Sequence, residues 1–234
     1  MTLQDNLSAI QARIDRAALD AGRDPADVDV LLAVKTQSAQ DIRAAIAAGY
    51  TLLGHNRVQE IRATAEELAE MGNLDHQMHM IGHLQSNKVS QALRHVSCVQ
   101  SVATARLADR LDRAAQARGQ NLEVFVQVNT SGEDTKGGVS PDEALELCTH
   151  IGGLDHLHLR GLMTIGANSP DPDVVRASYT DLAKLRDAVV RSGAPGTEHG
   201  SELSMGMSGD LEIAIAAGAT MVRIGTGVFG ERPE

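Results

Sequence analysis

The hydrophobic residues of this chain fall into short runs that alternate with longer amphipathic stretches. Eight of the runs have the length and the apolar character of buried strands. They cover residues 29–34, 50–54, 77–82, 95–102, 122–128, 158–165, 202–205 and 220–224. Between most of them the apolar residues recur at helical spacing, as in 103–119 and 140–153. The pattern therefore predicts strands and helices in alternation.

Two of the predicted helices have distinctive sequence signals. In the first, apolar residues recur three or four positions apart from Leu3 to Ala18, which predicts an amphipathic helix before the first strand. The second begins in "SPDE", where Ser140 is the expected N-cap, Pro141 takes the first helical position and Glu143 would complete a capping box.

Strand–helix alternation of this kind is typical of a parallel sheet covered by helices. Eight strands that are apolar on both faces favour closure into a barrel over an open sheet. No linker that would mark a second domain is visible. We therefore expect an α/β fold, a (β/α)₈ TIM barrel that forms a single domain over residues 1–234, with an extra N-terminal helix.

Composition and charge narrow the range of functions. The chain has 234 residues, 42% of them hydrophobic, and a net charge of −10. Because nucleic-acid binding relies on clustered Lys and Arg, we expect no nucleic-acid partner. No leader-like start and no run long enough to span a membrane are visible, so a cytoplasmic protein without membrane contact is expected. Cys98 and Cys148 lie in apolar segments without a CxxC partner, which predicts buried free thiols.

Lys35 is the first candidate for chemistry. It ends the first predicted strand, and the active sites of such barrels lie at the carboxyl ends of the strands. By the two-residue period, Leu31, Ala33 and Lys35 share one face, so Lys35 points into the barrel mouth if that face is the lumen. A lysine withdrawn from water can attack a carbonyl and form a Schiff base. A solvated lysine at a strand end is the open alternative.

The last two strands end in loops rich in glycine and hydroxyl groups. "LSMGMSGD" leads into a helix that Ser208 or Asp210 would cap, and "MVRIGTG" ends the last strand. Barrels of this type often hold a phosphate between these two loops. Ser204 and Thr226 would supply hydroxyl groups, and Gly225 would allow close approach of a ligand. Turn and cap glycines are the alternative interpretation.

Arg223 lies within the last predicted strand, where an unpaired guanidinium is costly. A salt bridge to a carboxylate in the lumen and a contact to a ligand are both open. Together, Lys35, the phosphate loops and Arg223 describe a site for pyridoxal 5′-phosphate (PLP). In such a site the lysine takes the aldehyde, the loops take the phosphate, and the arginine donates to the pyridine nitrogen.

Seven motifs along the chain then resemble those of one family. "AVKT", "GHNRVQE", "HMIGHLQSNK", "VNTSGEDTKGG", "RGLMTIG", "LSMGMSGD" and "MVRIGTGVFG" are similar, in order, to motifs of the pyridoxal phosphate homeostasis protein family. The resemblance implies a barrel like the N-terminal domain of alanine racemase, with PLP on Lys35. It further implies that Ser204, Gly225 and Thr226 bind the phosphate, that Arg223 faces the ring nitrogen, and that Asn56 belongs to the site. His55 departs from the family, which usually has a glutamate there.

Several other polar or sulfur-containing residues were considered as functional candidates, and the sequence gives them weaker support. His76, His79 and His83 lie around the third strand but lack a familiar zinc spacing, so no metal site is expected. We expect His79 to be a buried hydrogen-bonding group and His83 to lie at the mouth. Lys136 lies in "GEDTKGG", which lacks the spacing of a nucleotide-binding loop, so we expect it to be a loop charge near the mouth and not a nucleotide ligand. The methionines at 163, 205 and 207 are expected in the core.

Three functions remain: a protein that holds and delivers PLP, a PLP-dependent amino-acid racemase or decarboxylase, and a binder of another phosphorylated metabolite. A racemase needs a second acid or base across the ring, which a tyrosine from a further domain usually supplies. Tyr50 and Tyr179 are the chain's two tyrosines, and neither is expected to face Lys35. An arginine at the ring nitrogen also weakens carbanion stabilisation.

We therefore expect a PLP-binding homeostasis protein, with little or no catalysis and no catalytic residue. PLP-dependent apo-enzymes are possible recipients of the cofactor, and a monomer is expected.

Overall fold

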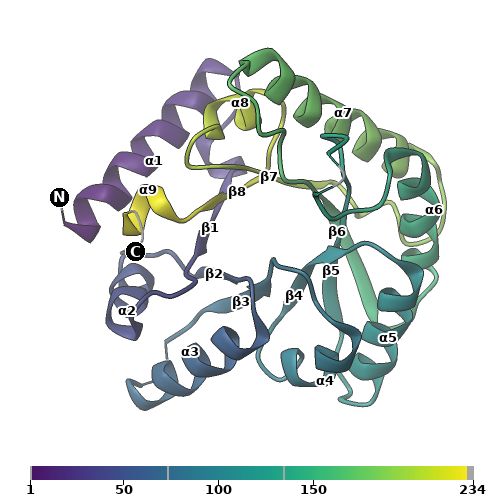
Figure 1. The fold of residues 1–234 in the computed structure, drawn as a ribbon, viewed down its shortest axis with the longest axis horizontal. Coiled ribbons are helices and arrows are strands. Elements are labelled where there is room, and N and C mark those ends of the chain that lie inside the picture. The colour runs from purple at the N-terminus through teal and green to yellow at the C-terminus, as the bar shows by residue number, and fades with distance from the viewer. Residues whose placement is uncertain (1, 73, 134, 231–234) are drawn as a thin grey trace.

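The strands of the chain form one closed parallel barrel. The computed structural model describes residues 2–72, 74–133 and 135–230. Within them, eight strands pair in chain order and β8 pairs back to β1 (Figure 1). The strands are β1 (Asp29–Ala33), β2 (Leu52–His55), β3 (Gln77–Met80), β4 (Cys98–Val102), β5 (Leu122–Gln127), β6 (Leu157–Met163), β7 (Glu202–Met207) and β8 (Met221–Ile224). The predicted (β/α)₈ fold is confirmed.

Helices surround the barrel on the outside (Figure 1). In chain order they are α1 (Leu3–Asp20), α2 (Ala39–Ala47), α3 (Val58–Glu70), α4 (Val89–Ala92), α5 (Ala105–Gln116), α6 (Pro141–Gly152), α7 (Pro172–Arg191), α8 (Leu211–Ala216) and α9 (Thr226–Phe229). The extra N-terminal helix, α1, is also confirmed, and it packs against α8 and α9. No helix in the described residues is long and apolar enough to cross a membrane.

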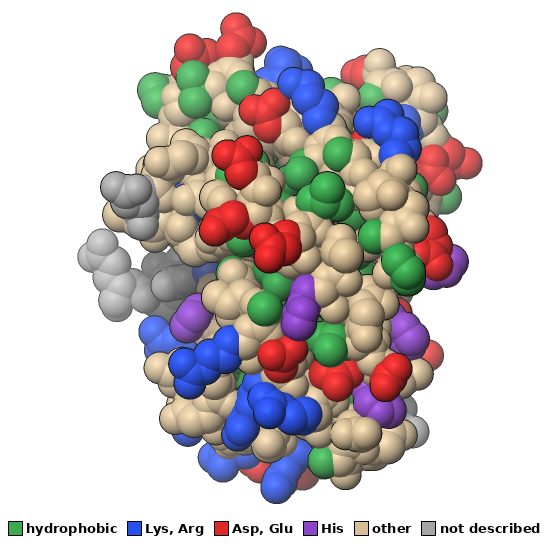
Figure 2. Space-filling model, turned by 90° about the vertical axis from the view of Figure 1, so that its right-hand side faces the viewer, with side chains coloured by type: hydrophobic (Ala, Val, Ile, Leu, Met, Phe, Trp, Pro, Cys, Tyr) green, Lys and Arg blue, Asp and Glu red, His purple; other side chains and the backbone are tan. Residues whose placement is uncertain are grey.

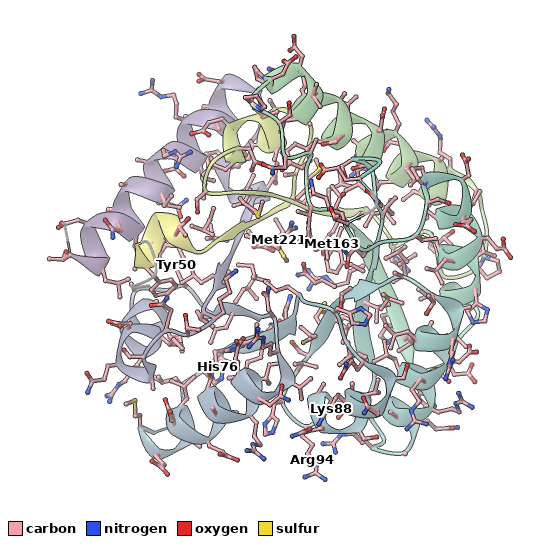
Figure 3. The ribbon with its side chains drawn as sticks, in the orientation of Figure 1. Tyr50, His76, Lys88, Arg94, Met163 and Met221 are labelled. Atoms are coloured by element: carbon pink, nitrogen blue, oxygen red, sulfur yellow. The ribbon has the colours of Figure 1, made fainter. Side chains whose placement is uncertain are left out.

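Two apolar layers hold the barrel together. A small cluster of Leu31, Cys98, Phe125, Met163 and Met221 fills the lumen. Figure 3 shows Met163 and Met221 at the centre of the ring of strands. A larger cluster lies between the strands and the surrounding helices. Leu31 in the lumen and Leu32 in the outer layer show how the two-residue period of a strand assigns side chains to the two layers.

Ion pairs lie in the lower part of the lumen, toward the amino ends of the strands. Arg160 on β6 donates to Glu123 on β5 at 2.8 Å and to Glu202 on β7. Its guanidinium carbon lies 5.9 Å from the centre of the Phe125 ring. These side chains take up the lumen at the end opposite to Lys35.

Some local predictions need correction. Ser140 is the N-cap of α6, but its side chain accepts no capping hydrogen bond. Instead its hydroxyl donates to the Glu143 carboxylate at 2.5 Å, so the predicted capping box does not form. Cys98 and Cys148 are buried and free, as predicted.

Candidate functional site

A cavity of about 370 Å³ opens at the carboxyl ends of the strands. Its size is within the range of roughly 300–1,000 Å³ that small-molecule sites occupy. The lining residues come from the ends of β1, β2, β3, β6, β7 and β8 and from the loops that follow. They are Ala33, Lys35, Asn56, Ile81, Met163, Ile165, Met207, Ser208, Gly209, Arg223, Gly225 and Thr226.

Lys35 lies two residues beyond the end of β1 and is half-buried. Leu31 packs in the lumen cluster and Ala33 lines the cavity together with Lys35, so the three share the predicted face. The next residue, Thr36, has φ +63°. A β-branched residue is strained in this left-handed region, so Lys35 is followed by a backbone conformation that its neighbours must hold in place.

Arg223 on β8 is buried, with 6% of its surface exposed, and it lines the cavity floor. One terminal nitrogen donates to the Ser204 hydroxyl at 2.9 Å and the other to the Thr164 carbonyl at 2.7 Å. Within the described residues no carboxylate forms a salt bridge with it. Burial lowers the pKa of Arg223, while Tyr179 and Asp210 act in the opposite direction. The salt bridge to a lumen carboxylate that the sequence left open is therefore not observed for Arg223 in the described residues.

The loops after β7 and β8 meet at one side of the cavity. The Gly227 N–H donates to the Ser208 hydroxyl at 3.0 Å, which ties the two loops together. Gly209 is open, because a Cβ built there would meet nothing within 4 Å. A Cβ on Gly225 would reach Ala33 at 3.5 Å and would narrow the cavity. The two loops thus form a cradle that suits an anion. It consists of two hydroxyl groups and two glycines, from Ser208, Gly209, Gly225 and Thr226.

A bulge in β7 determines which residues reach the cavity. The register against β8 shifts between Ser204 and Met207, and Gly206 takes φ +90°. A Cβ on Gly206 would lie 2.5 Å from the Ala214 Cβ, so this turn requires glycine. Beyond the bulge Met207 is 40% exposed at the cavity. The prediction that Met207 packs in the core is wrong, whereas Met163 and Met205 are buried as predicted.

Ser204 does not line the cavity. It is fully buried and pairs in register with Met221, two residues before Arg223 on β8. Its hydroxyl donates to Gln100 at 2.7 Å and accepts from Arg223. The predicted role of Ser204 as a phosphate ligand does not fit this placement, because β7 runs on to Met207 rather than ending at 205. Ser208, four residues later, has the position expected of Ser204.

Asn56 follows β2, is exposed, and lines the cavity as the sequence suggested. The loop after β3 approaches it closely, since a Cβ on Gly82 would lie 2.3 Å from the Asn56 carbonyl oxygen. His55 lies on the other face of β2, the face of Leu53, which packs in the helix-facing layer. It is buried, and neither ring nitrogen has a hydrogen-bond partner in the described structure. Burial lowers the pKa of His55 to about 4.

The histidines around β3 do not converge. His79 is buried in the lumen, where its Nδ1 lies 2.9 Å from the Gln100 amide nitrogen, as expected of a hydrogen-bonded core group. His76 lies outside the barrel beside α3 (Figure 3), and His83 is exposed. Across residues 2–72, 74–133 and 135–230, no group of three or more His, Cys, Asp or Glu could hold a metal ion.

The two tyrosines lie away from Lys35. Tyr50 precedes β2, at the amino end of the barrel, and donates to the Leu7 carbonyl and the Gln11 side chain. Tyr179, on α7, donates to Asp210 at 2.8 Å, and burial followed by the charge of Asp210 raises its pKa. Neither lines the cavity.

Lys136 lines a larger hollow of about 660 Å³ that shares Ile165, Met207 and Gly209 with the cavity. Its ammonium group donates to Glu133 and to the Gly166 carbonyl, both at 2.6 Å. The predicted loop position of Lys136 is confirmed.

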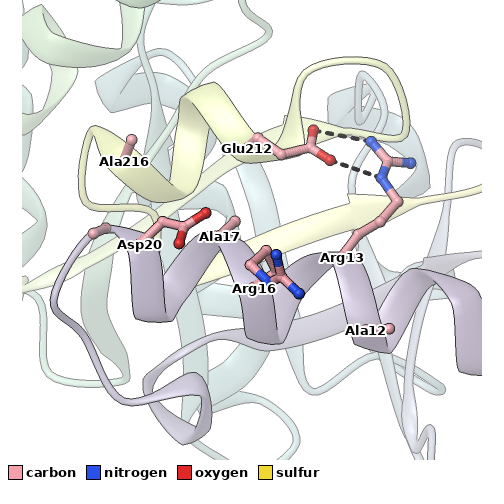
Figure 4. A pocket seen from close by; sticks show the side chains of 8 residues that line it. Ala12, Arg13, Arg16, Ala17, Asp20, Glu212 and Ala216 are labelled. Carbon is pink, nitrogen blue, oxygen red and sulfur yellow. Dashed lines mark hydrogen bonds and ion pairs between the residues drawn. The ribbon is translucent and has the colours of Figure 1, made fainter.

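A separate hollow of about 420 Å³ lies between α1 and α8 (Figure 4). Arg13 closes one end of it by donating to both oxygens of Glu212, at 2.7 and 2.9 Å. None of its lining residues lines the cavity at the strand ends.

Two residues were missed from the sequence. Ser208 was considered only as a helix cap, with Asp210 as the alternative, and Asp210 is the N-cap of α8; the glycines on either side of Ser208, at 206 and 209, could have indicated a turn into the cavity. Gln100 is a polar residue inside the apolar strand β4, and its full burial is the signal that it has specific partners.

Comparison with known proteins agrees with this geometry. The sequence profile of the family "alanine racemase, N-terminal domain" matches residues 6–233. Pyridoxal phosphate homeostasis proteins of Pseudomonas aeruginosa and Pasteurella multocida are 41% and 38% identical, each over 99% of this chain and 96% and 98% of theirs.

Solved structures agree as well. A protein of unknown function from Bifidobacterium adolescentis, 42% identical, covers 97% of this chain and 94% of its own with a TM-score of 0.93. PipY of Synechococcus elongatus with PLP bound, 33% identical, covers 93% of this chain and 100% of its own with a TM-score of 0.81. Alanine racemase of Clostridium difficile, at 16% identity, shows the shared fold, with a TM-score of 0.77 over 57% of its length.

Fold and profile together define a barrel of the alanine racemase N-terminal type. Within that class, the full-length matches show that the chain belongs to the pyridoxal phosphate homeostasis protein family.

Proposed function

We propose that this protein binds PLP as a Schiff base on Lys35. One observation carries the proposal: a single cavity is lined by a primary amine, by a guanidinium that forms no salt bridge within the described residues, and by a cradle of hydroxyl groups and glycines. The amine suits the aldehyde of PLP, the cradle suits its phosphate, and Arg223 suits an unprotonated pyridine nitrogen. When bound, PLP supplies an electrophilic carbon that reacts with amines.

In this proposal Ser208, Gly209, Gly225 and Thr226 hold the phosphate, and Asn56 lies at the cavity edge. The names of the relatives and the PLP-bound PipY structure support the choice of cofactor. The profile match over residues 6–233 and the closed barrel support one PLP-binding domain over residues 1–234.

We further propose that the protein acts in PLP homeostasis by holding the cofactor and passing it to PLP-dependent apo-enzymes in the cytoplasm, with little or no catalysis. Arg223 supports this role, because an arginine leaves the ring nitrogen unprotonated and so weakens the stabilisation of a carbanion. The positions of Tyr50 and Tyr179 also support it, since neither is placed to move a proton at the cavity. Wash-in of deuterium at Cα of a panel of amino acids tests this point. Turnover at the usual enzyme rates of roughly 1–10³ per second would replace the holding role by a racemase-like one.

Titration with PLP, followed by visible absorption, tests the binding site. The wild-type protein should develop a new visible band, and Lys35→Ala should not, because the band requires the amine. Lys184→Ala is the matched control, since Lys184 lies on α7 and pairs with Asp181 on the surface. A band of equal strength in Lys35→Ala would place the reactive amine elsewhere.

A further inference from the structure

A chain of hydrogen bonds crosses the lumen beneath the cavity. Arg223 on β8 donates to the Ser204 hydroxyl of β7 at 2.9 Å, and Ser204 donates to the Gln100 amide oxygen of β4 at 2.7 Å. The Gln100 amide nitrogen then lies 2.9 Å from His79 Nδ1 on β3. All four side chains are buried. Only Arg223 among them lines the cavity.

With the Gln100 amide oriented as in the structure, the donors and acceptors in this chain follow one direction. Arginine can only donate, so the Ser204 oxygen accepts from it and the Ser204 proton goes to Gln100. The Gln100 oxygen is then an acceptor and its amide nitrogen donates to His79. In this arrangement Nδ1 of His79 is unprotonated and the ring proton is on Nε2. Burial, and next the charge of Arg160, lower the pKa of His79 to about 3, so the ring is neutral near pH 7.

Every partner of Arg223 in this chain is consequently uncharged. The acceptor atoms of Ser204 and Thr164 orient the guanidinium, but they do not cancel its charge as a carboxylate would. A carboxylate partner would fix the side chain equally well and would neutralise it. The described structure thus keeps a positively charged guanidinium in the cavity wall that forms no ion pair with a carboxylate, although the more distant Asp210 acts on it electrostatically.

We propose that Ser204 and Gln100 are positioning residues for Arg223, which hold its guanidinium, free of any salt bridge in the described residues, against the ring of the bound cofactor. The inference rests on the proposed function, because it assumes that PLP occupies the cavity. It changes the role of Ser204, which acts on the ring end of the ligand through Arg223 and not on the phosphate. Gln100 acts indirectly, because it contacts Ser204 and Ser204 contacts Arg223.

Comparison of PLP with pyridoxal, which lacks the phosphate, separates these roles. Ser204→Ala and Gln100→Met should weaken both ligands by a similar factor, about tenfold, which is the effect of losing one hydrogen bond to a charged group. Ser208→Ala, in the cradle, should weaken PLP several-fold more than pyridoxal. A loss in Ser204→Ala that is confined to PLP would overturn the inference.

A second measurement excludes a merely structural effect. A fixed positive charge near the ring lowers the pH at which the visible absorbance of bound PLP changes, so freeing Arg223 in Ser204→Ala and Gln100→Met should raise that midpoint by roughly one unit. Ser101→Ala is the matched control: Ser101 is a buried serine next to Gln100 whose hydroxyl donates to the Gly82 carbonyl, outside the chain. Its midpoint should equal that of the wild type.

The positioning role would be refuted if Ser204→Ala and Gln100→Met both kept the wild-type midpoint of the absorbance change, in an experiment in which the wild-type protein binds PLP. If the wild-type protein itself binds neither PLP nor pyridoxal, the proposed function is wrong, and this outcome is separate from the first.

Discussion

Ser204 and Ser208 lie four residues apart on the same stretch of chain, yet the structure gives them different neighbours. Ser204 contacts Gln100 and Arg223 inside the barrel, whereas Ser208 lines the cavity and accepts from Gly227. From the sequence, a strand that ends at 205 places Ser204 at the mouth. The strand β7 instead continues through the bulge at Gly206 to Met207, two residues beyond that end, and Ser204 is left below the cavity floor. Residue types at a site can thus be predicted while their depth cannot.

Thr36 offers a test of strain beside the proposed reactive lysine. Its φ of +63° costs a β-branched residue about 1–2 kcal/mol, whereas asparagine tolerates the same conformation. Thr36→Asn should therefore raise the free energy of unfolding by about 1 kcal/mol, as measured by urea denaturation.

Thr149→Asn is the control, because Thr149 is an exposed residue within α6 and has no such strain. A decrease in stability for Thr36→Asn would show that Thr36 makes contacts that outweigh its backbone strain.

At the scale of elements, the alternation of strands and helices was predictable from hydrophobic periodicity alone. Each predicted strand overlaps an observed one, because a buried parallel strand is apolar on both faces and leaves a clear signal. The positions at which the strands begin and end were less predictable. The predicted strand 95–102 begins at Cys98, since the backbone of His95 and Val96 turns back onto Ala92 at the end of α4. Such turns depend on contacts that periodicity does not encode.

The bulge in β7 gives the prediction at this scale. Gly206→Ala combines an unfavourable φ of +90° with a Cβ placed 2.5 Å from the Ala214 Cβ on α8. We expect a loss of at least about 2 kcal/mol in the free energy of unfolding. The measurement is again urea denaturation, on the protein without added ligand.

Gly153→Ala provides the comparison, since a Cβ there would meet its nearest atom at 3.5 Å, an ordinary contact. Its stability should stay within about 0.5 kcal/mol of the wild type. Equal stability of Gly206→Ala and Gly153→Ala would mean that β7 and α8 can separate without cost.

At the scale of the whole molecule, charge and burial determine the response to pH. Figure 2 shows acidic and basic side chains interspersed on the side that carries α5, α6 and α7, with Lys and Arg gathered in its lower part. The net charge of the chain is −10, so the expected absence of a nucleic-acid partner stays a prediction from charge. Inside the protein, His55 and His79 are buried in neutral form.

Acid should destabilise the protein through these two residues. Their pKa values in the folded state, about 4 and about 3, lie below the ordinary value of 6.5. The unfolded chain therefore binds more protons between pH 6.5 and 4, and the free energy of unfolding should fall as the pH falls through this range. For His55 the loss is on the order of 3 kcal/mol.

His55→Leu should flatten this dependence by about one proton between pH 6.5 and 4, as followed by urea denaturation at a series of pH values. His199→Leu, at an exposed position, should keep the wild-type slope. Identical slopes for wild type and His55→Leu would show that folding does not lower the pKa of His55.

The central claim is that Lys35 carries the cofactor, and the chain's lysines make it directly testable. The sequence contains Lys35, Lys88, Lys136 and Lys184. The measurement is reduction of the PLP-loaded protein with borohydride, followed by proteolysis and mass spectrometry of the peptides. We predict a pyridoxyl group on the peptide that contains Lys35, at close to one per chain. A modification found mainly on Lys88, Lys136 or Lys184, or on none of the four, would contradict the account.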